Sequence, residues 1–154
     1  MHIFEKNIKD LDLHIPDMAM PIANYVPYKI FDKVLYVSGQ APVKEGSLIY
    51  KGKVEKDITE EDGIKAAELC CVNIIAALKT AINGDWERLD GFIKLGGFIN
   101  CNSSFTNHPQ IINGASDLLV KIFGDQGKHT RFAVGSNSLP MNISVEIDAI
   151  IKIR

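Results

Sequence analysis

The sequence predicts a single α+β domain in which two helices pack on one face of a mixed sheet. Its 154 residues suit one domain with a substantial core. Residues 59–84 and 109–124 each carry apolar side chains at helical spacing along one stripe. The remaining segments show strand periodicity, so the expected order is two strands, a short third strand, a helix, a strand, a helix and two strands.

The first quarter of the chain combines an arm with a hairpin. Residues 3–11 are expected to form a short helix or arm, and the three prolines of residues 14–27 predict an extended, irregular segment. Residues 28–39 predict two strands joined by a tight turn at Asp32-Lys33 and ending at Ser38-Gly39. Residues 47–54 predict a further short strand.

The sequence contains signals for both ends of the first long helix. Thr59 is the expected N-cap, followed by Asp62 and other acids in the first turn, and Asn83-Gly84 is the expected stop. The apolar stripe comprises Ile64, Ala67, Cys71, Ile74, Leu78 and Ile82.

The second half predicts a strand, a helix and two strands. In the strand 88–100, Gly96-Gly97 indicates a bend or bulge. Pro109 opens the second helix and Gly124 ends it. Strand 130–134 follows. The last strand, 143–153, places alternate residues on one apolar face: Ile143, Val145, Ile147, Ala149, Ile151 and Ile153.

The second face of this sheet is mixed in character. The last strand contributes Ser144, Glu146, Asp148, Ile150 and Lys152. On the middle strand the expected second face is Phe92, Lys94, Gly96 and Phe98, with Ile93, Leu95 and Ile99 opposite. Such a face is neither a core nor a plainly solvated surface, and it predicts a subunit interface in a closed symmetric oligomer.

Composition argues against several classes of protein. The net charge is −2 and no basic stripe occurs, so nucleic-acid binding is not expected. No apolar run approaches the roughly 20 residues that span a bilayer, and the charged N-terminus is unlike a secretory signal, so a cytoplasmic location is expected. Cys70, Cys71 and Cys101 lack metal-ligand or disulfide-framework spacing and predict buried, reduced thiols; no metal is expected.

Arg131 is the leading candidate for ligand binding. On its strand, Phe132 and Val134 are expected to face the helices, which places Arg131 and Ala133 on the interface side. A guanidinium there can hold a carboxylate through two parallel hydrogen bonds. The alternative is a structural ion pair with Glu146 or Asp148 that ties subunits together.

The other candidates also have two interpretations. Glu146 is either a carboxylate that orients or deprotonates a water, or a solvated or paired strand residue. Lys94 either contacts a ligand or forms an interface salt bridge. Tyr25 either walls a pocket or packs as an ordinary aromatic residue. Ser38-Gly39 either offers hydroxyl and N–H groups to an anion or forms a turn, and Asn113 either serves the helix terminus or holds a loop.

With these residues in place, residues 20–154 resemble the RidA/YjgF family, also called the endoribonuclease L-PSP family. The resemblance rests on these segments in this order: "ANYVP", "LYVSGQAPV", "AAELCCVNIIAAL", "FIKLGGFIN", "INGASDLLVKIFG", "HTRFAVG" and "LPMNISVEIDAI". It implies a chorismate-mutase-like fold in residues 1–154, with 1–20 as an arm, and a homotrimer whose sheets line a central barrel with clefts between subunits.

The resemblance also implies an activity. Active members hydrolyse enamine and imine acids to 2-keto acids and ammonia without metal or organic cofactor, so a small carboxylate is the expected substrate. The family's carboxylate-binding arginine falls on Arg131 and its water-associated glutamate on Glu146. The same comparison assigns substrate-binding roles to Tyr25, Ser38, Gly39, Lys94 and Asn113.

The chain departs from the family pattern in ways typical of a divergent branch. Deaminating members often have a cysteine two residues after the arginine, where this chain has Ala133, and Gly135 stands where many have an acid. The N-terminal arm is also longer than in compact members. Ala133 keeps a second hypothesis open, a trimer that binds keto acids without turnover. The endoribonuclease and translation-inhibition role is the third, which the acidic charge balance disfavours.

Overall fold

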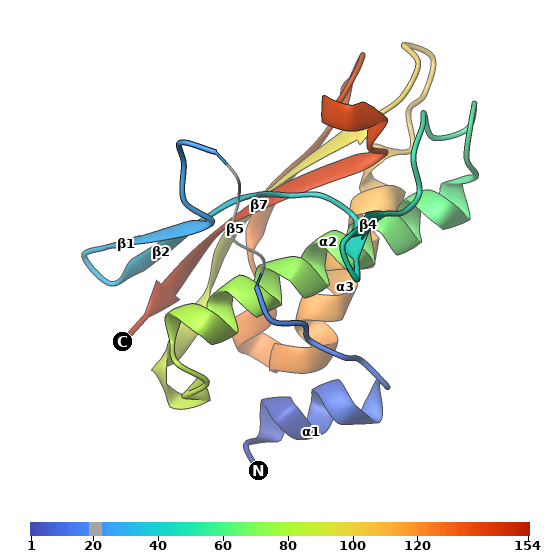
Figure 1. The fold of residues 1–154 in the computed structure, drawn as a ribbon. Coiled ribbons are helices and arrows are strands. Elements are labelled where there is room, and N and C mark those ends of the chain that lie inside the picture. The colour runs from blue at the N-terminus through green and yellow to red at the C-terminus, as the bar shows by residue number, and fades with distance from the viewer. Residues whose placement is uncertain (19–22) are drawn as a thin grey trace.

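The core of the fold is a five-stranded mixed sheet in the order β1-β2-β7-β5-β6 (Figure 1). The computed structural model describes residues 1–18 and 23–154, so part of the expected irregular segment lies outside the described residues. β5 and β6 run parallel, and the other neighbouring pairs run antiparallel. The strands are β1 (Tyr28–Phe31), β2 (Val34–Gln40), β5 (Leu89–Asn100), β6 (Thr130–Ser136) and β7 (Val145–Ile153).

Within residues 1–18 and 23–154, two short strands and six helical segments accompany the sheet. The expected strand at 47–54 is shorter than predicted, because β4 (Ser47–Leu48) pairs only with β3 (Val43–Lys44). The α-helices are α1 (Ile3–Asp10), α2 (Glu60–Ala81) and α3 (His108–Phe123). The 3₁₀ turns are η1 (Trp86–Arg88), η2 (Gly124–Gly127) and η3 (Pro140–Asn142). Helices α2 and α3 lie on the same face of the sheet (Figure 1), as the sequence predicts.

The ends of the predicted elements are confirmed where short-range chemistry sets them. Thr59 Oγ1 accepts a hydrogen bond from Asp62 N at 3.1 Å and so caps α2. The β1–β2 turn places Asp32 and Lys33 at φ values of 51° and 64°, the left-handed pair that a two-residue hairpin loop requires. Gly124 ends α3 at a φ of 59°.

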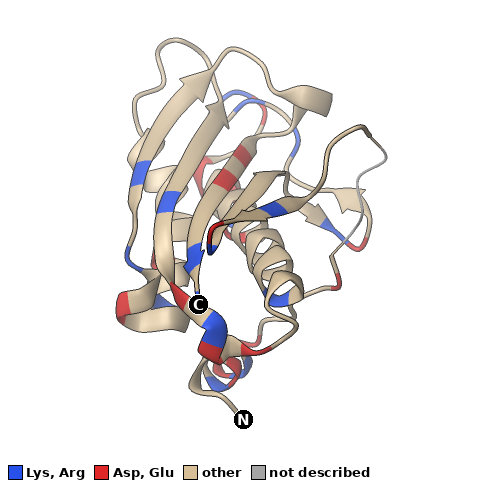
Figure 2. Cartoon of the chain, turned by 90° about the vertical axis from the view of Figure 1, so that its left-hand side faces the viewer, with Lys and Arg blue, Asp and Glu red and all other residues tan. Residues whose placement is uncertain are grey.

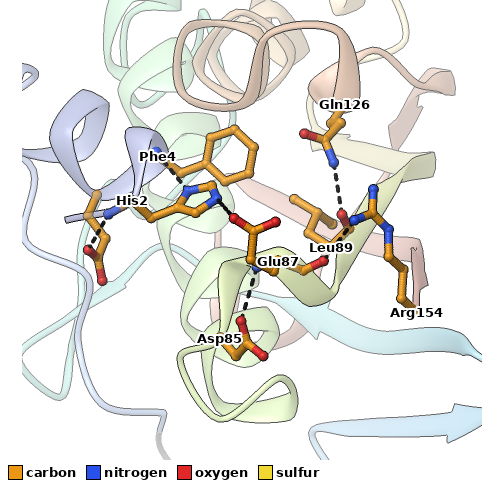
Figure 3. Close-up of polar contacts among 8 residues, drawn as sticks. His2, Phe4, Asp85, Glu87, Leu89, Gln126 and Arg154 are labelled. Carbon is orange, nitrogen blue, oxygen red and sulfur yellow. Dashed lines mark hydrogen bonds and ion pairs between the residues drawn. The ribbon is translucent and has the colours of Figure 1, made fainter.

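The N-terminal arm is docked on the domain by an aromatic cluster. Phe4 packs edge-on against Phe123 and Trp86, with ring centroids 5.0 and 6.3 Å apart. His2 caps α1 through Nδ1, while its Nε2 lies 3.2 Å from Glu87 Oε1 (Figure 3). The aromatic contacts bury Phe4 and fix α1 against the C-terminal end of α3.

A bulge in β5 changes which side chains share a face. The register of β5 against β7 shifts between Phe92 and Lys94, rather than at the predicted Gly96-Gly97. Phe92 is therefore buried with Leu95, whereas Ile93 is exposed, the reverse of the expected arrangement. Gly96-Gly97 stays in register, and its glycines relieve crowding instead: a Cβ at Gly97 would lie 2.7 Å from Ile112.

The sheet has one covered face and one open face. Alternate residues of β7 are buried under the helices from Val145 to Ile153, as predicted. The opposite face, called the open face below, exposes large apolar side chains of three strands, Tyr36, Phe98 and Val134. Charged groups of both signs lie along the strands of this sheet (Figure 2). The open face thus has the mixed character that the sequence predicts.

Candidate functional site

Glu146 lies on the open face beside the end of β2. The β2–β7 register carries a bulge between Val37 and Gln40, and Gly39 in this bulge approaches Glu146 closely. A Cβ at position 39 would lie 3.0 Å from the Glu146 carboxyl carbon, so the missing side chain leaves room for the carboxylate. Burial raises the pKa of the half-buried Glu146 carboxyl above its ordinary value of 4.5, and the nearby Asp148 charge raises it further.

Ser38 joins this position to the segment that carries Tyr25. Its Oγ donates a hydrogen bond to the carbonyl of Val26 at 2.6 Å, and its N–H donates to Pro27 O at 2.9 Å. The Ser38 hydroxyl therefore donates its hydrogen bond within the chain. Tyr25 itself is exposed. Ser38, Gly39 and Glu146, with Tyr25 beside them, are called the glutamate half-site below.

Lys94 lies on the open face but away from Glu146. It pairs in register with Ile150, whereas Phe98 pairs with Glu146, so four residues of β5, or about 13 Å, separate the two positions. The Lys94 ammonium lies 5.2 Å from the centre of the Phe132 ring, a cation–π contact. Within one chain, Lys94 therefore does not join the glutamate half-site.

Arg131 lies on the helix side of the sheet, so the face predicted for it is wrong. It pairs with Leu95, a fully buried residue of the covered face. Its Nη1 donates to Ser116 Oγ at 3.0 Å and its Nη2 to Pro109 O at 3.4 Å, both on α3. Phe132 takes the open face instead, where it packs edge-on against Phe98 at 5.3 Å.

Asn113 lies beside Arg131 by the geometry of α3. The two α3 residues that Arg131 contacts, Pro109 and Ser116, are four residues before and three residues after Asn113. Residues at these spacings share one face of a helix. Asn113 is exposed and borders a hollow of about 330 Å³ between α2 and α3. Arg131, Asn113 and Ser116 are called the arginine half-site below.

The two half-sites lie on opposite faces of the sheet. Arg131 shares the covered face with Leu95 and Ala149, while Glu146 shares the open face with Phe98 and Val134. One small ligand cannot touch both residues of the same chain across the sheet. The structure therefore brings the predicted residues together in two groups, and it leaves Lys94 apart from both.

Ser116, which links His129 to Arg131, was not predicted from the sequence. Ser116 Oγ lies 2.8 Å from His129 Nε2, and His129 Nδ1 lies 2.7 Å from Gly127 O. The sequence signal for Ser116 is its helical spacing with Pro109 and Asn113, which places the three residues on one side of α3.

The remaining candidates from the sequence take the following places. Cys70, Cys71 and Cys101 are buried and free, as predicted, and burial raises the pKa of each thiol. In residues 1–18 and 23–154, no group of three or more His, Cys, Asp or Glu residues is placed to hold a metal ion. No helix of these residues combines the length and apolar character that crossing a membrane requires.

Comparison with known proteins identifies the family. Residues 5–150 match the model of the family described as "YjgF/chorismate mutase-like, putative endoribonuclease". The chain belongs to this family. Protein TCP17 of Trypanosoma cruzi is 35% identical over 149 residues, which cover 96% of this chain and 92% of that protein.

Two solved structures are similar over nearly the whole chain. Protein Atu1372 from Agrobacterium tumefaciens, of unknown function, is 43% identical with a TM-score of 0.92, covering 99% of this chain and 94% of its own. A protein from Shewanella oneidensis MR-1, described as a putative endoribonuclease, is 34% identical with a TM-score of 0.93. The match covers 98% of this chain and 99% of that protein. Because these matches leave almost nothing of this chain uncovered, they include the N-terminal arm.

Proposed function

We propose that the protein hydrolyses reactive 2-imino acids, and their enamine tautomers, to 2-keto acids and ammonia. Water adds to the imine carbon, the C–N bond then breaks, and the nitrogen leaves as ammonia while the carbonyl forms. The imine carbon is already electrophilic, so placing the carboxylate and the water supplies most of the acceleration. Arg131 binds the carboxylate, and Glu146 orients the water.

The observation that carries this proposal is the setting of Arg131. Its guanidinium is half-buried at the edge of the sheet, held by Ser116 and a backbone carbonyl, both neutral acceptors. The described residues place no carboxylate within ion-pair distance of it. A positioned cation whose contacts are all neutral retains its charge and further N–H groups for an organic anion.

A second copy of the chain supplies the other half of the site in this proposal. Arg131 and Glu146 lie on opposite faces within one chain, so a ligand held by the first meets Glu146 of a neighbouring copy. The exposed Tyr36, Phe98 and Val134 of the open face support such assembly, because apolar groups of this size favour burial between subunits. We propose the homotrimer implied by the family resemblance, with its clefts between copies.

Replacement of Arg131 tests the activity directly. The imine is generated in situ by a pyridoxal-phosphate-dependent dehydratase, and release of ammonia and keto acid is followed. We expect Arg131→Ala to lower kcat/KM by about 100-fold, since two charge-assisted hydrogen bonds are lost. Arg154→Ala is the matched control, because Arg154 contacts Glu87 O at the far end of the domain (Figure 3). An Arg131→Ala protein with unchanged turnover would contradict the proposal.

Ala133 favours one alternative, a binding protein without turnover. It occupies the strand position two residues beyond Arg131, where deaminating members often have a cysteine, and it packs against the core. Calorimetry with 2-oxobutyrate, run beside the turnover assay, separates the two functions: tight binding without hydrolysis identifies the binder. Ribonuclease activity has less support, because a net charge of −2 provides little attraction for phosphates.

A further inference from the structure

When His129 is neutral, the hydrogen bonds around Arg131 have one consistent set of directions. A guanidinium donates and never accepts, so Ser116 Oγ is the acceptor of the bond from Arg131 Nη1. A carbonyl only accepts, so the short contact between His129 Nδ1 and Gly127 O requires the proton on Nδ1. In neutral His129 the Nε2 atom is then an acceptor, and the Ser116 hydroxyl donates to it over 2.8 Å.

The far end of this chain of hydrogen bonds is anchored in tightly packed backbone. Gly127 is buried, and a Cβ at this position would lie 2.2 Å from the carbonyl oxygen of Leu119 in α3. The carbonyl that accepts the hydrogen bond from His129 Nδ1 is therefore fixed against the same helix that carries Ser116. The series Gly127, His129, Ser116 and Arg131 begins on rigid backbone and ends on the guanidinium.

We propose that His129 is a positioning residue for carboxylate recognition, acting through Ser116 on Arg131. By accepting a hydrogen bond from the Ser116 hydroxyl, His129 turns the hydroxyl so that a lone pair faces Nη1, which holds the long arginine side chain in one orientation before the ligand arrives. The inference rests on the proposed function, since it concerns the same arginine.

His129 does not take part in proton transfer to the substrate in this arrangement. Its Nδ1 is used by Gly127 O and its Nε2 by the Ser116 hydroxyl, so both ring nitrogens already have partners within the chain. Its effect therefore appears in ligand affinity and in KM, whereas kcat changes little. This separates the inference from general acid–base catalysis, which would lower kcat.

Paired substitutions test the series as one unit. We expect Ser116→Ala and His129→Ala each to raise KM for the imino acid, and Kd for 2-oxobutyrate, by about 10-fold. The double variant should be no weaker than either single variant, because the second change removes a bond that the first has already broken. His129→Gln keeps an amide acceptor for Ser116 and a donor for Gly127 and should restore part of the affinity. His14→Ala, an exposed histidine, is the control.

The outcomes distinguish this inference from the proposed function. If Arg131→Ala also leaves turnover unchanged, the proposed function fails. If Arg131→Ala is inactive while Ser116→Ala and His129→Ala keep the wild-type KM and Kd, or if the two losses add in the double variant, the positioning role is overturned. Nitrogen-15 NMR of His129 gives a readout without activity: the Nδ1–H tautomer is expected, and a neutral ring protonated on Nε2 would contradict the proposal.

Discussion

Glu146 combines a half-buried carboxyl with an acidic neighbour, and this combination makes stability depend on pH. Its pKa is raised in the folded chain, so the folded state favours the protonated form. The stabilising contribution is complete below the ordinary pKa of 4.5 and is lost as the pH rises through the raised value. At neutral pH the ionised group therefore lowers the free energy of unfolding.

Glu146→Gln should consequently raise the melting temperature at pH 7.5, and this gain should shrink as the pH falls toward 4.5. Thermal unfolding followed by circular dichroism at both pH values measures the effect. Glu68→Gln, an exposed carboxylate on α2, serves as the control and should show little of this dependence. A Glu146→Gln protein that melts below wild type at pH 7.5 would show that the folded chain stabilises the ionised Glu146 carboxylate instead.

At the scale of residues, the face of the sheet on which a candidate side chain lies could not be predicted from the sequence. Alternation places Arg131 and Ala133 on one face of β6 but carries no information on which face is covered. That choice is made by Phe132, whose partner Phe98 belongs to a neighbouring strand far away in the sequence. The Ser116–His129 hydrogen bond also joins two separate elements, so no local sequence motif predicts it.

At the scale of elements, the crossing of α2 and α3 depends on Gly114. A Cβ there would lie 2.3 Å from the carbonyl oxygen of Ile64, a backbone atom that has little freedom to move. Gly114→Ala should lower the free energy of unfolding by about 1–3 kcal/mol, although alanine favours helix. Chemical denaturation measures the change, and the exposed Asp117→Ala in the same helix is the control. Equal stability of the two variants would mean that α2 and α3 can move apart without a loss in the free energy of unfolding.

The elements whose limits were predicted well are those with local end signals. Thr59, Gly124 and the Asp32-Lys33 turn act within a few residues of the chain, so the sequence contains the whole cause. The bulge of β5 depends on its alignment with β7, where Phe92 pairs with Ile151 and Lys94 with Ile150. The two glycines that suggested a bulge instead accommodate Asp148 and Ile112. Strand register is therefore the part that sequence pattern leaves open.

At the scale of the whole molecule, the separation of the half-sites makes a prediction about mixed assemblies. If the site takes Arg131 from one copy and Glu146 from another, co-expressed Arg131→Ala and Glu146→Gln chains regain activity, although each variant alone is impaired. When the two variant chains assemble at random, about one quarter of the sites contain both an intact Arg131 and an intact Glu146. Turnover of the co-purified mixture measures this value. Activity no greater than the mean of the two separate variants would place both residues in sites of a single chain.

The mixed character of the open face was predictable because the last strand alternates over its whole length. The division of the candidate residues between two faces was not, since it follows from the register of β5 with both β6 and β7. Composition and periodicity thus predicted the layers, while the pairing of distant strands determined where each functional group lies.

The docking of α1 gives the molecule a built-in optical reporter. Trp86 is the only tryptophan of the chain, and it is buried next to Phe4 of the arm. Release of the first ten residues would admit water to the indole and move its fluorescence to longer wavelengths, while the rest of the domain kept its circular dichroism. Emission from one ring therefore distinguishes an undocked arm from an unfolded domain, without any added label.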